Sequence, residues 1–439
     1  MAQQENAFEE ISRDLLHFIS KSPSPFHAAR GIKTAFVYDH AVELREEDDW
    51  EIEPGHKYVV TRNGSAVIAF AVPKEPARDF RIIAAHGDSP TFKIKEDPEI
   101  ADGPYVRLNV EPYGGMIMSS WTDRPLTVAG RVIVREKGAL VPKLVCPGKP
   151  LLVIPSLAIH MNREVNQGYH WNAQKDLLPL WGPAGGLSFM DVIAAEAKCA
   201  KEDILGHDLC LVPLVPGTMW GAENEYISSP RLDDLQCAFA AFRGYTMGKK
   251  EKHISVFALF DNEEVGSGTR QGAGSSFLFD TILRLSAALG ISQNRMLAML
   301  ARSFLISADN AHAVHPNHPA ESDPVNRPVL NGGIVIKEAA NQHYCTDAFS
   351  RAVFQAICDD ADVPTQAFAN KSDMAGGSTL GNLSNMQASM HAVDVGLPQL
   401  AMHSSYETGG VRDVMYAIRA LTAFYERNLT INGAESVEL

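Results

Sequence analysis

The sequence lacks the features that mark a membrane or nucleic-acid-binding protein. No apolar run among its 439 residues approaches the roughly 20 residues that a membrane-spanning helix needs. The opening residues, Met1 to Asn6, are polar and lack the basic and apolar blocks of a secretory signal. Positive charge is also in deficit, with 39 Lys and Arg against 53 Asp and Glu, for a net charge of -14. We therefore expect neither nucleic acid nor an anionic membrane as partner.

Cysteine is scarce and scattered. No pair forms a CxxC motif among the six cysteines: Cys146, Cys199, Cys210, Cys237, Cys345 and Cys358. An even number would permit a disulfide framework, but a chain of this size does not need one to fold. The pattern favours reduced structural thiols and predicts a cytoplasmic protein.

Internal repeats and low-complexity tracts are also absent, which excludes repeat architectures and long disordered segments. The composition, 45% hydrophobic and 21% charged, is that of a globular protein. A chain of 439 residues exceeds what one hydrophobic core usually organises, so two domains are expected.

The first hundred residues predict an amphipathic helix followed by strands. Apolar side chains recur at helical spacing from Phe8 to Ile19, and Pro23 and Pro25 end that pattern. Residues 57–60 and 66–71 are expected to pair as a hairpin turned at Asn63-Gly64. The apolar run 81–85 is expected to be a buried strand.

The middle of the chain differs from both ends. From about Pro104 to Pro230, prolines and glycines are frequent, and the apolar runs are short, at 128–134, 151–154 and 209–215. After Arg231, expected helices at 235–247, 277–289, 347–361 and 411–428 alternate with expected strands at 254–260, 304–308, 333–336, 365–369 and 399–402. Unbroken apolar strands between helices indicate a sheet covered on both faces.

We therefore predict an α/β fold with a central mixed sheet flanked by helices and interrupted by a β-rich insertion. Residues 1–100 and 231–439 would form the discontinuous catalytic domain. Residues 101–230 would form the insertion, with a role in oligomerisation.

Metal-binding side chains stand where the expected strands end. His86 follows residues 81–85, Glu263-Glu264 follow 254–260, Asp309 follows 304–308, and His403 follows 399–402. Open α/β sheets place their sites outside the carboxyl ends of strands, so these side chains are expected to meet in one crevice. Asp233, at the start of the next helix, is the expected fifth member.

Each of these residues alone has an ordinary explanation. A lone histidine is usually packed, a Glu-Glu pair is usually a solvated turn, and Asp233 would suit a helix N-cap. Together, two histidines and three carboxylates exceed what one open tetrahedral site needs and favour two ions sharing a bridging carboxylate. Mixed His and carboxylate ligands suit Zn²⁺, with Co²⁺ or Mn²⁺ also possible.

Such a pair of ions predicts hydrolysis. Two metals about 3.5–4 Å apart can activate water and polarise a carbonyl, but a carboxylate outside the metal shell must take the proton. Neighbouring side chains diverge, so one member of Glu263-Glu264 can bind metal while the other faces the substrate.

Along almost its whole length the sequence resembles the aspartyl aminopeptidase family of dinuclear zinc metallopeptidases. The motifs that carry the resemblance are His86 to Pro90, Trp121 to Leu126, Leu157 to Arg163, Ser229 to Asp233, Asp261 to Ser267, Ser307 to Asn317, Val335 to Lys337 and Met402 to Ser404. The resemblance implies an enzyme that removes acidic residues from peptides with a free N-terminus.

The resemblance also implies a role for each site residue. His86 and Asp309 would bind one metal, Glu264 and His403 the other, and Asp233 would bridge them. Asp88 would orient His86 as its hydrogen-bond partner, and Glu263 would be the general base.

Further residues are implied around the substrate: His312, Lys337 and Tyr344. Lys337 would supply the local positive charge that an acidic protein needs in order to bind acidic peptides, although a solvated lysine at a strand end is the simpler explanation. His160 would reach the active site of a neighbouring subunit in a tetrahedral shell of twelve subunits built from dimers, although by itself it would suit a packed histidine beside a strand.

The sequence departs from the family pattern in three places. Asp234 stands where Asn usually follows the bridging Asp, and Asn382 stands where Pro is common. The segment from Ala320 to Pro328 also diverges. An extra carboxylate at Asp234 would alter metal preference or the charge that the substrate meets.

Three alternatives stay open at this point. The first is a broad aminopeptidase that prefers neutral residues. The second is an inactive scaffold, which would predict a broken ligand set. The third is a two-metal amidohydrolase acting on non-peptide amides, which the metal chemistry alone does not exclude.

Overall fold

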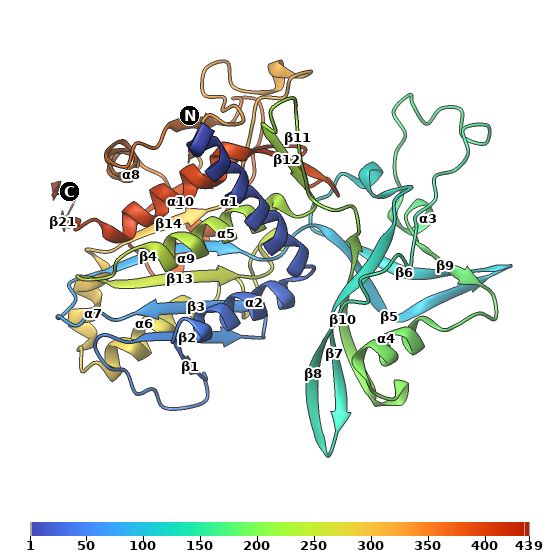
Figure 1. Cartoon of the computed structure of the whole chain (residues 1–439), viewed down its shortest axis with the longest axis horizontal. Helices are drawn as coiled ribbons and strands as arrows, with labels where there is room; N and C mark the ends of the chain where they lie inside the picture. Colours follow the sequence, from blue (N-terminus) through green and yellow to red (C-terminus); the bar gives the residue numbers. More distant parts are fainter. Residues whose placement is uncertain (1, 434, 439) are drawn as a thin grey trace.

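Nine strands form a mixed central sheet in the computed structural model, which describes residues 2–433 and 435–438 (Figure 1). In spatial order they are β1 (Val42–Leu44), β2 (Lys57–Arg62), β3 (Ala66–Ala71), β13 (Ile254–Phe260), β4 (Phe80–His86), β14 (Phe304–Ala308), β18 (His391–Gly396), β16 (Ile334–Glu338) and β17 (Thr365–Ala369). The strands β13, β4, β14 and β18 run parallel at its centre.

Alternate side chains of the central strands enter two separate cores, as expected for a sheet buried on both faces. In β4, Ile83 and Ala85 pack into one core and Ile82 and Ala84 into the other. Helices α1 (Ala2–Lys21), α2 (Pro25–Tyr38), α5 (Leu232–Met247), α8 (Ala348–Asp360) and α10 (Val411–Glu426) cover the first face. Helices α6 (Phe277–Ala288), α7 (Gln293–Leu300) and α9 (Leu380–Gln387) cover the second. The expected α/β fold is confirmed.

The expected hairpin is present. Strands β2 and β3 pair antiparallel, and the turn residues Asn63 and Gly64 have φ of 57° and 69°. Two successive positive φ values are the geometry that an Asn-Gly turn favours, so this register follows from the local sequence.

A second, antiparallel sheet of six strands stands beside the first (Figure 1). In spatial order it contains β8 (Ala139–Val145), β7 (Leu126–Glu136), β10 (Ile204–Pro213), β5 (Thr91–Asp102), β6 (Tyr105–Tyr113) and β9 (Leu180–Pro183). This sheet has its own core, which includes Phe92, Trp121 and Phe189. Helix α4 (Phe189–Ala197) contributes to that core, and the short helix α3 (Ala173–Asp176) also belongs to this part of the chain. The sheet includes β5, which begins at Thr91. The domain limits 101 and 230 remain a proposal.

A third sheet joins segments far apart in the sequence. It contains β11 (Thr218–Trp220), β12 (Tyr226–Ser229), β20 (Glu407–Gly410), β19 (Pro398–Leu400) and β15 (Ala311–His312). A two-stranded sheet, β21 (Thr430–Asn432) and β22 (Ser436–Glu438), follows near the end of the chain.

One strand prediction was wrong. The run 399–402 is not a strand of the central sheet, because β19 ends at Leu400 and pairs with β15 and β20. The run 151–154 makes only isolated bridges at Leu152 and Val153, since prolines flank it on both sides.

The edge strand β1 of the central sheet was not predicted, and neither was the inner strand β18. The apolar run of β18 is broken by Asp394, which is fully buried and accepts hydrogen bonds from the Thr379 hydroxyl and the Cys345 amide. A buried carboxylate satisfied in this way is compatible with a strand, but its partners come from elsewhere in the chain.

Among the described residues, no helix combines the length and apolar character needed to cross a membrane. All six cysteines are free thiols.

Candidate metal centre

Three neighbouring parallel strands carry the first group of site residues. His86 is the last residue of β4, the single-turn helix Glu263–Val265 follows β13, and Asp309 follows β14. Backbone hydrogen bonds hold the strand ends, from Gly87 N to Phe260 O and from Asp309 N to Val395 O, each 2.9 Å long. The sheet therefore brings these side chains to one edge, as the sequence predicted.

Asp233 lies between the two histidines. Its Oδ1 is 3.6 Å from His86 Nε2, and its Oδ2 is 3.3 Å from His403 Nε2. The residue sits at the start of α5, where its backbone N–H donates to Glu407 Oε2 at 3.0 Å. One carboxylate with each oxygen facing a different imidazole is the arrangement that a bridging ligand requires.

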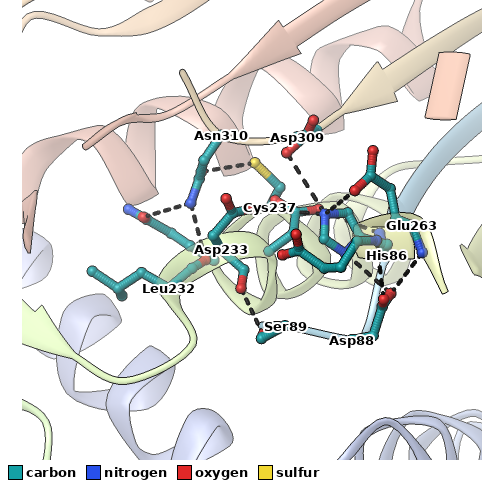
Figure 2. A network of polar contacts seen from close by, with 12 residues as sticks. His86, Asp88, Ser89, Leu232, Asp233, Cys237, Glu263, Asp309 and Asn310 are labelled. Atoms are coloured by element: carbon teal, nitrogen blue, oxygen red, sulfur yellow. Dashed lines mark hydrogen bonds and ion pairs between the residues drawn. The ribbon is translucent and has the colours of Figure 1, made fainter. Parts of the chain in front are cut away.

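The His86 ring is surrounded by carboxylates (Figure 2). Its Nε2 lies 3.7 Å from Asp309 Oδ1 and 4.0 Å from Glu263 Oε2, and its Nδ1 lies 3.3 Å from Asp88 Oδ1. Asp88 itself accepts from Glu263 N and Glu264 N, both at 3.2 Å. Nε2 thus faces the carboxylates that would share an ion, while Nδ1 faces Asp88.

His403 pairs with the other glutamate. His403 Nε2 is 3.3 Å from Glu264 Oε2, and the His403 N–H donates to Glu407 Oε1 at 2.7 Å. The side chain of Glu264 is 3% exposed and that of Glu263 is 15% exposed. The two neighbouring glutamates therefore diverge, one toward His403 and the other toward the crevice.

The donor set fits two divalent cations. The side chains form two groups of possible ligands, one of His86, Asp233, Asp234 and Asp309 and one of Asp233, Glu264 and His403. Several of their buried oxygens accept no hydrogen bond: Asp233 Oδ1, Asp234 Oδ1 and Glu264 Oε1. The distances of 3.3–3.7 Å between ligand atoms match the edge of roughly 3.3 Å of a tetrahedron with Zn–N and Zn–O bonds of about 2.0–2.1 Å.

The pKa shifts of the site residues also favour bound cations. Burial and nearby carboxylates raise the pKa of Glu263 to about 8, and the same causes raise the pKa of Glu264 well above its usual value. Burial lowers the pKa of His403, but Asp233, together with Glu407, more than offsets burial and raises that pKa to about 9. Gathering these acids without a cation is unfavourable, so bound cations would stabilise the arrangement.

A cavity of about 300 Å³ opens beside this cluster. Four members of the cluster and three residues expected around the substrate line it: Asp233, Glu263, Asp309, His403, His312, Lys337 and Tyr344. All of the expected residues of this site except His160 therefore lie in the cavity wall or directly behind it.

Lys337 is buried, with 2% of its side chain exposed. Its Nζ lies 2.7 Å from Asp309 O, 3.3 Å from Asp309 Oδ2 and 3.2 Å from Asn310 O, and it stands 5.2 Å from the centre of the Tyr344 ring. Burial lowers the pKa of Lys337, but the negative charge of Asp309 and smaller contributions from Tyr344 and Asp394 together give a net upward shift. The ammonium thus stays charged, but it already contacts Asp309.

Two of the three departures from the family pattern, Asp234 and Asn382, lie near the site. Asp234 is fully buried and accepts from His86 N at 3.3 Å, so its carboxylate belongs to the first ligand group. Asn382 lies in α9, after the cavity-lining residues Gly377 to Thr379, and accepts from the Ser378 hydroxyl at 3.4 Å. The Ala320–Pro328 segment is largely exposed.

His160 does not line the cavity of its own chain. It lies on an exposed loop with no helix or strand, between Ile154 and α3. The loop extends away from the central sheet (Figure 1).

Glu407 was not predicted as part of the site. It accepts from the backbone N–H groups of both Asp233 and His403, two proposed ligands 170 residues apart. A lone glutamate in the motif-free stretch after His403 carries no sequence signal, since its partners are backbone groups that only the fold brings together.

Residues 18–425 match the family described as aminopeptidase I zinc metalloprotease (M18). A probable M18 family aminopeptidase 2 of Clostridium novyi is 45% identical over 426 residues, covering 95% of this chain and 98% of that protein. An aspartyl aminopeptidase of Dictyostelium discoideum is 37% identical over 466 residues, covering 95% of this chain and 96% of that protein.

Solved structures share the fold. The structure of Ape4 in complex with Nbr1 is similar with a TM-score of 0.93 at 34% identity, covering 97% of this chain and 87% of that chain. The mApe1 dodecamer of S. cerevisiae is similar with a TM-score of 0.84 at 26% identity, covering 95% and 97%.

Proposed function

The chain belongs to the M18 family of zinc metallo-aminopeptidases, and from this premise we propose that it removes N-terminal Asp or Glu from peptides. The observation that carries the catalytic part is Asp233, whose two oxygens face His86 and His403 separately. We propose the ligand sets as His86 and Asp309 for one ion, Glu264 and His403 for the other, and Asp233 for both.

Bound at these residues, two Zn²⁺ ions would supply Lewis acidity toward the scissile carbonyl and a nucleophilic water. Glu263 would accept the proton of that water, because its carboxylate faces the cavity and lies outside both ligand groups. Asp88 would hold the His86 ring through Nδ1, leaving Nε2 for the ion.

The acidic preference rests on the cavity wall. Lys337 is a buried cation beside Tyr344 in the same cavity as Glu263. Asp309 Oδ1 faces His86, so the negative charge of Asp309 would partly neutralise an ion bound there. Asp309 would then neutralise less of the positive charge of Lys337. The name of the Dictyostelium relative, aspartyl aminopeptidase, agrees with this proposal.

A broad aminopeptidase is the second candidate, and one observation favours it. Lys337 Nζ already makes three contacts with Asp309 and Asn310, so a substrate carboxylate would have to compete for its protons. The two candidates predict different substrate profiles.

The zinc-reconstituted enzyme should show a kcat/KM at least about tenfold higher for Asp and Glu than for Leu and Lys chromogenic substrates, since one charge-assisted hydrogen bond contributes about 1.5–3 kcal/mol. Lys337→Met should reduce that ratio toward one by raising KM for acidic substrates. Lys249→Met removes the same charge from an exposed site beyond the far end of α5 and serves as control. Equal losses on all substrates would reject the specificity role and leave a broad aminopeptidase.

We also propose that the enzyme works as a shell of twelve subunits built from dimers, in a reducing, cytoplasmic environment. Three apolar side chains around His160 are exposed: Leu157 at 56%, Ile159 at 48% and Met161 at 75%. Apolar side chains exposed together on one loop favour a protein contact. The dodecameric structure of mApe1 and the free thiols support the two parts of this proposal.

If His160 serves a neighbouring subunit, isolated dimers should lose activity while keeping their metal. Full assemblies of His160→Ala should lose about 10²-fold in kcat. Mixing His160→Ala subunits with Glu263→Gln subunits should restore activity, because some sites then combine an intact Glu263 with a partner's His160. Fully active dimers would contradict a dependence of catalysis on the larger assembly. Mixtures no better than either variant alone would contradict a shared site.

A further inference from the structure

A segment of the second sheet reaches into the metal centre. Residues 113–120, here called the connecting segment, leave β6 at Tyr113 and end in the single-turn helix Met118–Trp121. They contact the groups behind both proposed metal positions, although none of these residues is itself a proposed ligand.

Tyr113 contacts the carboxylate that faces His86. Its hydroxyl donates to Asp88 Oδ2 at 2.6 Å and accepts from Asn262 Nδ2 at 2.9 Å. The Asn262 amide is itself held, because its oxygen accepts from Thr269 Oγ1 at 2.8 Å and Gln271 Nε2 at 2.7 Å. With the Asn262 N–H pointing at the phenol oxygen, the Tyr113 proton is directed to Asp88.

Asp88 is therefore held by three donors. Two are backbone N–H groups from Glu263 and Glu264, and the third is the Tyr113 hydroxyl, which makes the shortest of the three contacts. Asp88 Oδ1 in turn lies 3.3 Å from His86 Nδ1. The chain of contacts runs from Asn262 through Tyr113 and Asp88 to the His86 ring.

The next residues contact the other half of the centre. A Cβ on Gly114, whose φ is +75°, would lie 3.0 Å from Glu264 Cβ and 3.3 Å from Glu264 O, so only glycine fits there comfortably. A Cβ on Gly115 would lie 4.0 Å from His403 Nδ1, and Ile117 N donates to His403 O at 3.0 Å. Ser120 O accepts from the Ser405 hydroxyl at 2.5 Å.

We propose that the connecting segment positions both imidazoles of the metal centre, with Tyr113 as a positioning residue that acts on His86 through Asp88. The proposal rests on the proposed metal sites. Partners behind a metal-bound histidine set its ring orientation, and their loss typically weakens metal binding about 10–100-fold. The second sheet would thus help to build the catalytic site as well as any subunit contact.

Tyr113→Phe tests the proposal by removing one hydroxyl and nothing else. Tyr105→Phe is the matched control, since it removes a hydroxyl from the same strand at a side chain that is 57% exposed. Zinc affinity is measured by competition with a chromophoric chelator, and the Co²⁺-substituted proteins are compared by their visible absorption. We expect Tyr113→Phe to lower the affinity for the ion at His86 at least about tenfold, because Tyr113 contacts His86 through Asp88. The visible spectrum of the Co²⁺-substituted protein should change as well. Tyr105→Phe should match wild type in both measurements.

A double-mutant cycle separates positioning from general destabilisation. In the Asp88→Asn background, Tyr113→Phe should change zinc affinity by no more than about twofold, because its route to His86 is already altered. An equal loss in both backgrounds would overturn the proposal, as would unchanged affinity and spectrum in Tyr113→Phe. If wild-type protein bound no zinc, the proposed function would fail first; if wild type bound two ions and Tyr113→Phe matched it, only the positioning role would fail.

Discussion

Glu263→Gln should lower kcat by about 10³-fold while both ions stay bound, because general-base catalysis is worth about 10²–10⁴-fold. Glu263 faces the cavity and lies outside both ligand groups, so an amide of the same shape leaves the ligands in place. Turnover on an acidic substrate and metal content by atomic emission measure the two effects separately.

The adjacent glutamate is the matched control for this experiment. Glu264 Oε2 lies 3.3 Å from His403 Nε2, so Glu264→Gln should reduce the metal content itself. Near-normal kcat in Glu263→Gln would assign the base elsewhere, and equal metal loss in both variants would mean that the two side chains do not have separate roles.

The pH dependence of the wild-type enzyme gives a further readout. Burial and neighbouring carboxylates raise the pKa of Glu263 to about 8 before any cation is counted. A base works as the carboxylate, so kcat should rise as pH rises through this pKa. Bound cations favour the carboxylate, so the rising limb should lie below pH 8, and Glu263→Gln should lose it.

Asp233→Asn should abolish activity, by at least about 10³-fold, and reduce zinc from two ions per chain to fewer than one. One carboxylate faces both histidines, so a neutral amide with a single oxygen weakens both positions together. Metal content and isothermal titration with Zn²⁺ measure the loss. Two ions retained in an active variant would show that Asp233 bridges nothing.

Asp234→Asn provides the control at the next residue. Asp234 belongs to the first ligand group only and accepts from the His86 backbone, which an amide oxygen can also do. This variant should keep both ions. An ion present at about 1,000 times its Kd stabilises the folded protein by about 4 kcal/mol. Wild type stripped of metal by a chelator and Asp233→Asn should therefore have similar melting temperatures, both lower than that of zinc-loaded wild type.

Much of the site was predictable because strand ends of a parallel sheet converge by geometry. His86, Asp309 and the two glutamates follow apolar runs that are strands β4, β14 and β13, which are neighbours in the sheet. His403 lies beside Asp233 and Glu264 as expected, but the reason given for it was partly wrong, since the run before it belongs to the third sheet rather than the central one.

The sequence pattern could not predict the surroundings of residues whose contacts are made with distant parts of the chain. Lys337 was expected either as a positive charge beside the substrate or as a solvated lysine at a strand end, whereas the fold buries it against Asp309. Glu407 and Tyr113 form hydrogen bonds with residues 174 and 25 positions away, respectively. No local periodicity or motif encodes contacts of that kind.

The sequence by itself determined the α/β class, the hairpin at Asn63-Gly64, the positions of helices α1, α5, α6, α8 and α10 and the kinds of ligand available, because these follow from local periodicity, turn preference and side-chain chemistry. Only the tertiary structure decided which oxygen of Asp233 faces which histidine, that Lys337 is held by Asp309, and that the second sheet reaches Asp88 through Tyr113. Those outcomes depend on distances between chain segments, and such distances are set when the two cores pack.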